Sequence, residues 1–169
     1  IRNVHGKEDT LITIQIDFQL AERFGMEYID RDGQKKYPYI IHRTSIGCYE
    51  RTIALLIEKY AGAFPTWLAP VQAKVLPISE KVMDRADEVL AALKKAGIRA
   101  ELDDRAEKIG YKIRDARLNK IPYMVILGQK EAEDGTVSVR SRGQGDVGSM
   151  ELDACVNMIL EDIREKRKP

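Results

Sequence analysis

Residues 40–51, IIHRTSIGCYER, bring together side chains whose types could do chemistry. A strand would end near His42, and a histidine in that place could bind a metal or act as an acid or a base. Gly47 lacks a side chain, so a flat ligand could approach the backbone there. One helical turn further on, the guanidinium of Arg51 could stack on an aromatic base or pair with a phosphate. Taken one at a time, however, a lone histidine is more often structural and a helical arginine is more often solvated.

Basic residues form a second candidate group. The stretch 104–120 holds Arg105, Lys108, Lys112, Arg114, Arg117 and Lys120, interspersed with Asp104, Glu107 and Asp115. The strand expected at 136–142 adds Arg140 and Arg142. Such clusters can grip phosphates, whereas unpaired bases also need hydrogen-bonding groups and stacking partners. The alternative is a solvated helix face, which accounts for most charge runs.

Composition limits the classes of protein to which this chain can belong. Its 169 residues include 28 Lys and Arg against 27 Asp and Glu, and the net charge of +1 excludes a wholly basic nucleic-acid coat but allows a local basic face. Cys48 and Cys155 are far apart in the sequence, which excludes a disulfide framework and is typical of a reducing, intracellular setting. No apolar run approaches the roughly 20 residues of a membrane-spanning helix. The chain begins Ile1-Arg2-Asn3 without a methionine, so we expect it to be cut from something longer.

The first 66 residues predict an antiparallel fragment with one helix. We expect a strand at 10–18, a turn at 30–33, a returning strand at 36–43 and a helix at 46–61 that Ser45 caps. In the first strand, Thr13 and Gln15 share a polar face opposite Ile14 and Ile16. That alternation is typical of a sheet with one face toward solvent.

After the connector at 62–70, which is rich in Gly and Pro, the sequence predicts alternating strands and helices. We expect strands at 71–78, 98–103, 122–128 and 136–140, and helices at 80–96, 104–119 and 150–166, the last capped by Ser149. The continuous apolar run at 122–128 predicts a central, buried strand. This order predicts an open α/β sheet with helices packed on it. We therefore expect two domains, 1–66 and 67–169.

These segments resemble the C-terminal part of the bacterial-type threonyl-tRNA synthetases. The matching stretches are TIQIDF, PYIIHRTSIGCYERTIALLIE, GAFPTWLAPVQ, DDRAEKIGYKIRDARLNKIPYMVILG and GSMELDA. They occur in the family order across essentially the whole chain, and the GxxER motif followed by FPTWLAPVQ is highly specific. The resemblance implies that 1–66 is the end of an antiparallel class II catalytic domain (α+β). It implies that 67–169 is an α/β anticodon-binding domain, with a mixed sheet flanked by helices.

For the first segment, the resemblance implies a pocket for ATP and threonine. GCYER, at 47–51, looks like the third class II motif, in which Arg51 would contact ATP and Glu50 would help to position it. These two are the catalytic residues that the resemblance implies. The pocket would be lined by Thr13, Gln15, Arg43, Gly47, Cys48 and Arg51. ATP would bind together with Mg²⁺.

The resemblance also implies a zinc ion. His42 looks like the third zinc ligand of the family, and Zn²⁺ would hold the amino and hydroxyl groups of threonine and reject valine. The other two ligands belong to upstream parts of the family fold, and neither His5 nor Cys155 sits at a matching position. We therefore expect the 169 residues to be inactive alone.

For the second segment, the resemblance implies recognition of a tRNA anticodon. The residues that would contact it are Lys108 and Arg114 in EKIGYKIR, Glu131 in GQKE and Arg140 in VSVR. A carboxylate such as that of Glu131 could accept hydrogen bonds from a guanine edge. Ala106 stands where the family often has Asn, so one base contact is expected to be lost or replaced.

The function that the resemblance implies is that of a threonine–tRNA ligase. Such an enzyme activates threonine with ATP and transfers it to tRNA(Thr), and the parent protein is expected to be a cytoplasmic homodimer with no membrane segment. The alternative is a non-catalytic tRNA-binding or accessory module built on an anticodon-binding domain. A third possibility is a structural α/β domain whose basic helix binds nothing.

Overall fold

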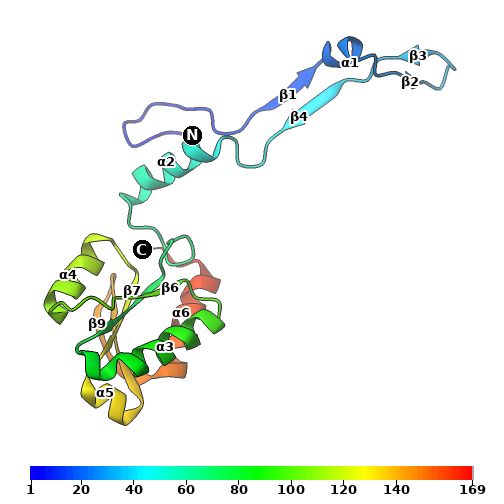
Figure 1. The fold of residues 1–169 in the computed structure, drawn as a ribbon. Coiled ribbons are helices and arrows are strands. Elements are labelled where there is room, and N and C mark those ends of the chain that lie inside the picture. Colours follow the sequence, from blue (N-terminus) through cyan, green and yellow to red (C-terminus); the bar gives the residue numbers. More distant parts are fainter. Residues whose placement is uncertain (169) are drawn as a thin grey trace. The chain divides into compact units, whose positions relative to one another are not determined.

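A computed structural model describes residues 1–168, which divide into two compact units (Figure 1). The first unit runs from Ile1 to Lys59 and the second begins at Tyr60. The elements that start in the first unit are β1 (Ile14–Asp17), α1 (Leu20–Arg23), β2 (Tyr28–Ile29), β3 (Lys35–Lys36), β4 (Ile40–Arg43) and α2 (Tyr49–Tyr60). Among the described residues, no helix combines the length and apolarity needed to cross a membrane.

The first unit consists of two antiparallel strand pairs and a helix. β1 pairs with β4, and β2 pairs with β3 across the predicted turn, where Gly33 adopts a φ of +75°. The unit buries little of its apolar surface, because Ala21 is its one buried hydrophobic residue and Ile14 and Ile16 are 65% and 55% exposed. The unit therefore has no hydrophobic core of its own.

Helix α2 begins later than predicted, at Tyr49 rather than at residue 46, so Ser45 does not cap it. Gly47 has a φ of +77°, a left-handed conformation that interrupts the expected helical run. A Cβ on Gly47 would lie 2.1 Å from the carbonyl oxygen of Leu11. The close approach of these two backbone segments thus requires glycine at this position.

The second unit is built on one mixed sheet of five strands in the order β6-β5-β7-β8-β9. Its elements are β5 (Ala73–Pro77), the 3₁₀ turn η1 (Glu80–Val82), α3 (Met83–Lys95), β6 (Ala100–Leu102), α4 (Ile109–Leu118), β7 (Tyr123–Leu127), α5 (Gln129–Asp134), β8 (Thr136–Ser141), β9 (Gly145–Glu151) and α6 (Leu152–Glu165). β5 is parallel to β6 and β7, while β7, β8 and β9 are antiparallel. The predicted mixed α/β fold and the central position of the apolar strand β7 are confirmed.

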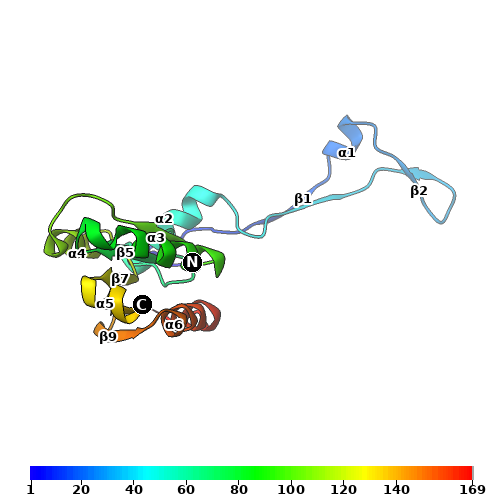
Figure 2. The same cartoon turned by 60° about the horizontal axis from the view of Figure 1, so that its bottom comes forward.

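The two faces of this sheet are covered to different extents. Helices α3 and α6 pack on one face over Val75, Val125 and Val139, all fully buried. Helix α4 packs on the other face against Leu76 and Met124 (Figure 1). Figure 2 shows α6 alongside β9, which it contacts. The α4 face of β8 therefore carries only partly buried side chains.

Two elements of the second unit were not predicted, and α3, α4 and α6 begin at residues 83, 109 and 152 rather than at 80, 104 and 150. β9 and α5 were missed, and Ser149 lies in β9 rather than capping α6. Gly145 and Gly148 have φ values of +80° and +100°, so this strand lacks the alternating β-branched pattern that would reveal it. Helix α4 begins at Ile109 rather than at 104, because the side chain and backbone N–H of Arg105 bind the Asp103 carboxylate.

The connector after α2 packs into the second unit, which begins at Tyr60. Thr66 donates a hydrogen bond from its hydroxyl to the buried carboxylate of Asp162 on α6. Tyr123 donates to the same carboxylate at 3.0 Å. Arg142 donates to the carbonyl oxygens of Ala63 and Phe64. These bonds fix residues 63–66 to the sheet and to α6.

Candidate nucleic-acid interface

In the first unit, the strand register decides which pocket residues share a face. Gln15 on β1 lies directly opposite His42 on β4, and residues paired in this way point to the same side of an antiparallel sheet. Arg43 pairs with Ile14 one position along, so its side chain points to the other face. The sheet thus brings Gln15 and His42 together and separates Arg43 from them, while Thr13 precedes β1.

The GxxER motif lies at the start of α2, where its side chains have local partners. Arg51 donates from Nη1 to the carbonyl oxygen of Thr10 at 2.8 Å. The Cys48 thiol donates to Oε2 of Glu50 at 2.7 Å, and this bond holds the pKa of the Glu50 carboxyl below its usual range. All three side chains are exposed. Arg51 therefore ties the beginning of α2 to the segment before β1.

The described residues do not fit a zinc ion. Within residues 1–168, no group of three His, Cys, Asp or Glu side chains is placed to hold a metal. Cys155 is buried in α6, and burial raises the pKa of its thiol to about 11. His42 therefore has no companion ligands in this part of the chain, and we derive no catalytic step through a metal.

The basic residues of the second unit divide into two groups, and the first group is engaged by the fold. Lys112 is 3% exposed and donates to the carbonyl oxygens of Pro77 and Asp103 at 3.1 and 2.9 Å. Lys120 donates to the carbonyl oxygen of Ala61. The guanidinium of Arg142 donates to three carbonyl oxygens, and burial lowers its pKa. These cations are held in place by hydrogen bonds to backbone oxygens.

Arg105 belongs to the same structural group. It binds both oxygens of the Asp103 carboxylate at 2.8 and 2.6 Å, and Asp115 at 2.8 Å. Its guanidinium carbon also lies 5.6 Å from the ring centre of Tyr111. The Arg105 hydrogen bonds hold the pKa of the buried Asp103 carboxyl below its usual range. This network shapes the loop that leads into α4.

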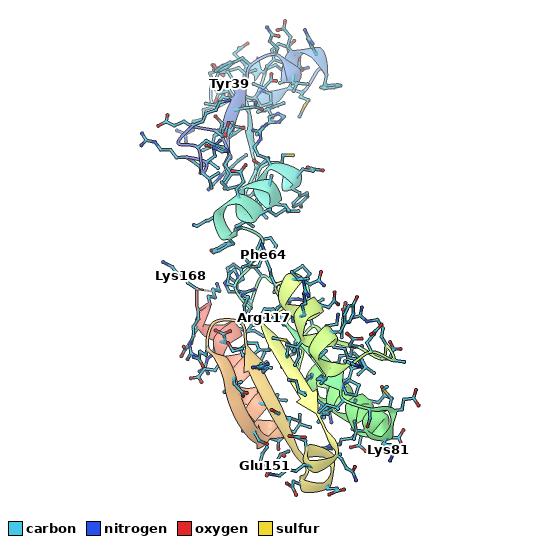
Figure 3. All side chains as sticks on the ribbon, turned by 90° about the vertical axis from the view of Figure 1, so that its left-hand side faces the viewer. Tyr39, Phe64, Lys81, Arg117, Glu151 and Lys168 are labelled. Atoms are coloured by element: carbon cyan, nitrogen blue, oxygen red, sulfur yellow. The ribbon has the colours of Figure 1, made fainter. Side chains whose placement is uncertain are left out.

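The second group of basic residues faces solvent on α4. Lys108 begins the helix, and Arg114 and Arg117 lie on it; all three are exposed. Their side chains have no hydrogen bond or ion pair to another residue in the described part of the chain. Because Arg114 and Arg117 are three residues apart, they are neighbours on the helix surface. Figure 3 shows Arg117 toward the end of α4.

Glu131 lies in the first turn of α5, which follows the carboxyl end of β7. Its Oε2 accepts a hydrogen bond from the backbone N–H of Gly128 at 3.0 Å, which leaves Oε1 for another donor. A Cβ on Gly128 would lie 2.7 Å from that carboxylate, so glycine is needed for this placement. β6 and β7 both lie parallel to β5, and Lys108 follows β6 as Glu131 follows β7. Lys108 and Glu131 therefore both lie at the carboxyl edge of the sheet, where open α/β sheets bind ligands.

Arg140 lies on the sheet face that carries α4. It pairs with Met124 across β7 and β8, and Met124 packs beneath α4. Its guanidinium is half-buried and lies 3.9 Å from the carboxylate of Asp146 on β9. Lys108, Arg114 and Arg140 thus border the same side of the sheet, with Arg140 toward the amino end of β7 and Glu131 beyond its carboxyl end. Sequence reasoning missed Gly128, whose role depends on a contact that only the fold reveals.

Comparison with known proteins relates both units to tRNA synthetases. Residues 72–162 match the family described as "Anticodon binding domain", and residues 1–60 match "tRNA synthetase class II core domain (G, H, P, S and T)". The chain is 66% identical to a threonine–tRNA ligase of Clostridium perfringens, over 98% of its own length and 26% of the relative's. A threonine–tRNA ligase of Clostridium botulinum is 64% identical over 99% of the chain and 26% of the relative.

A solved structure gives the same relation. The RNA binding domain of threonyl-tRNA synthetase from Cryptosporidium parvum aligns with a TM-score of 0.76 and 34% identity. The alignment covers 95% of this chain and 40% of that one. The chain thus spans about a quarter of the length of the curated relatives it matches.

Proposed function

This chain belongs to the anticodon binding domain family, and we propose that its second unit reads the anticodon of a threonine tRNA. The observation that carries the proposal is the row of side chains along the α4 face of the sheet and beyond the carboxyl end of β7. Lys108 and Arg114 on α4 have no partners among the described residues, and Arg140 lies on the same face. Glu131 keeps one carboxylate oxygen for a donor.

The chemistry of this group suits an unpaired RNA loop. Lysine and arginine bind the phosphates, while bases that are unstacked from the loop expose edges that side chains can read. Glu131 accepts hydrogen bonds from a base that presents N–H donors, as guanine does on its Watson–Crick edge. The capping bond from Gly128 holds that carboxylate in a fixed position. Lys108, Arg114 and Arg140 supply affinity, and Glu131 supplies the discrimination.

For the first unit, we propose a part in the catalytic domain of a threonine–tRNA ligase. In this proposal Arg51 contacts ATP, which binds with Mg²⁺, and Glu50 positions it, while Gln15 and the strand around it line the threonine pocket. The match of 1–60 to the class II core domain supports the ligase over a stand-alone accessory module. The exposed apolar side chains of this unit support packing against further parts of a larger protein. The proposal includes a cytoplasmic, homodimeric parent in which upstream ligands complete a zinc site with His42.

Binding to anticodon stem-loops tests the proposal for the second unit. We expect the chain to bind the threonine anticodon stem-loop at least about tenfold more tightly than one with a changed middle base, because each correctly read base contributes about 1–3 kcal/mol. Arg114→Ala should weaken binding to the first stem-loop. Fluorescence anisotropy at two salt concentrations provides the measurement. Equal, weak and salt-sensitive binding to both stem-loops would contradict anticodon reading.

The ligase proposal has a separate test. Joined to the upstream segment that a relative possesses, the chain should support threonine-dependent exchange of pyrophosphate into ATP, and Arg51→Ala should abolish it. A folded, zinc-loaded protein without exchange activity would count against the ligase, whatever the stem-loop titration gives.

A further inference from the structure

We propose that a groove beside Arg117 holds one unpaired nucleotide of the bound RNA, without regard to its base, next to the residues that read the anticodon. The groove lies between α4 and the open part of the sheet and has a volume of about 270 Å³. It is lined by Ile113, Arg117, Ile121, Met124, Arg140, Ser141, Arg142 and Gly145. The inference rests on the proposed function, since it assigns a second subsite of the same surface.

The charge of the groove favours an anionic ligand. Three of its lining residues are arginines and none carries a carboxylate. Arg142 is held in place by its bonds to backbone oxygens, and Arg140 has Asp146 at 3.9 Å. The guanidinium of Arg117 has no partner within residues 1–168, so it is the group that a phosphate would engage. A guanidinium binds phosphate through two parallel hydrogen bonds.

The floor of the groove favours a base that is tolerated rather than read. Ile121 and Met124 are 8% and 3% exposed and present apolar surface beside the more open Ile113. The lining has no Asp, Glu, Asn or Gln, and the hydroxyl oxygen of Ser141 already accepts a hydrogen bond from the N–H of Gly143 at 3.3 Å, so little remains to accept hydrogen bonds from base N–H groups. Stacking on apolar or guanidinium surface is tolerant of sequence, because every base has a π-face. The groove therefore contributes affinity and leaves discrimination to its neighbours.

The groove also borders the reading group directly. Arg140 lines it and is one of the residues proposed to contact the anticodon, and Arg114 is a neighbour of Arg117 on the surface of α4. A nucleotide in the groove and a base at Arg140 would therefore be close together along one strand. Arg117 is accordingly a binding residue that positions the loop for reading.

Substitution of Arg117 tests the inference. In the 169-residue chain, Arg117→Ala should weaken binding to both stem-loops, threonine and middle-base variant, by about tenfold and leave their ratio unchanged. The slope of the logarithm of the binding constant against the logarithm of the salt concentration should decrease in magnitude by the amount expected for one lost phosphate contact. Arg117→Lys keeps the charge and should recover part of the affinity. Lys94→Ala, an exposed lysine on α3 on the opposite face, is the matched control and should change neither quantity.

Each outcome decides the inference. If Arg117→Ala binds like Lys94→Ala, the groove holds no nucleotide. If Arg117→Ala changes the ratio of the affinities for the two stem-loops, the groove reads a base, and the proposal that it accepts any base is wrong. If the unaltered chain shows no preference between the stem-loops, the proposed function fails and the inference fails with it. If the unaltered chain prefers the threonine stem-loop and Arg117→Ala leaves both the affinity and this preference unchanged, the inference is overturned while the proposed function stands.

Discussion

Glu131→Gln is expected to abolish most of the preference of the chain for the threonine anticodon stem-loop. Glutamine has the same size, and its amide oxygen can still accept the N–H of Gly128, so the start of α5 should persist. The other end of the amide is a donor and cannot accept from a base. A lost base contact costs about 1–3 kcal/mol, so we expect binding to weaken about 10- to 100-fold for the threonine stem-loop only. Anisotropy titrations with both stem-loops measure the ratio.

Two further variants separate base reading from charge and folding. Glu133→Gln removes the same charge from the exposed side of α5 and should keep the preference. Gly128→Ala places a Cβ 2.7 Å from the Glu131 carboxylate, so the flexible carboxylate should move and the preference should fall without unfolding. Retention of the full preference in Glu131→Gln would refute the role assigned to this carboxylate.

Asp162→Ala is expected to lower the stability of the second unit strongly. The Asp162 carboxylate is 9% exposed and accepts from the hydroxyls of Thr66 and Tyr123. Its removal leaves two buried hydroxyls without this acceptor, each at a cost of about 1–3 kcal/mol, so the free energy of unfolding should fall by about 2–6 kcal/mol. Urea denaturation monitored by circular dichroism gives this quantity.

A neighbouring carboxylate supplies the control for Asp162→Ala. Glu161 lies on the same helix and is exposed, and its one ion pair within residues 1–168 is a 3.9 Å contact with Arg167, so Glu161→Ala should cost less than about 1 kcal/mol. Equal effects of the two substitutions would contradict the claim that Asp162 joins the connector to the sheet.

The same site predicts how stability depends on alkaline pH. Burial, and next the Asp162 charge, raise the pKa of the Tyr123 phenol above its usual value of 10.0. A pKa raised by folding means that the unfolded chain loses this proton first as the pH rises. The stability contributed by Tyr123 is therefore present below pH 10 and declines above it. Tyr123→Phe should lessen that decline, and an identical alkaline slope in both proteins would contradict it.

Hydrophobic pattern was enough to predict the central part of the fold. The uninterrupted apolar run of β7 indicated a strand buried on both sides, and the structure places it between β5 and β8. β9 was not predicted, because it lacks the alternation of apolar and polar residues that indicates a strand. Two of its glycines have left-handed backbone conformations, and its pairing with β8 is irregular between Val139 and Arg140. The pattern of apolar residues reveals a strand that buries side chains. It does not reveal a strand such as β9, which is held mainly by backbone hydrogen bonds.

The candidate site was less predictable because charge in a sequence does not reveal its partners. From the sequence we grouped Arg114 with Lys112, Lys120 and Arg142 as basic residues that could grip phosphates. In the structure, the last three donate hydrogen bonds to backbone carbonyl oxygens. Likewise, the helix start expected at Asp104 depended on a local capping pattern, which the contact of Arg105 with Asp103 and Asp115 displaces. The roles of Lys108, Arg114, Glu131 and Arg140 toward RNA remain predictions.

NMR mapping of the RNA-binding surface would show whether the α4 face of the sheet reads the anticodon. The backbone amide resonances of the isotope-labelled chain would be followed by NMR while the threonine anticodon stem-loop is added. We expect the largest shifts at Lys108–Arg114, at Gly128–Glu131 and around Arg140. Shifts concentrated on α3 and α6, which cover the opposite face of the sheet, would contradict it.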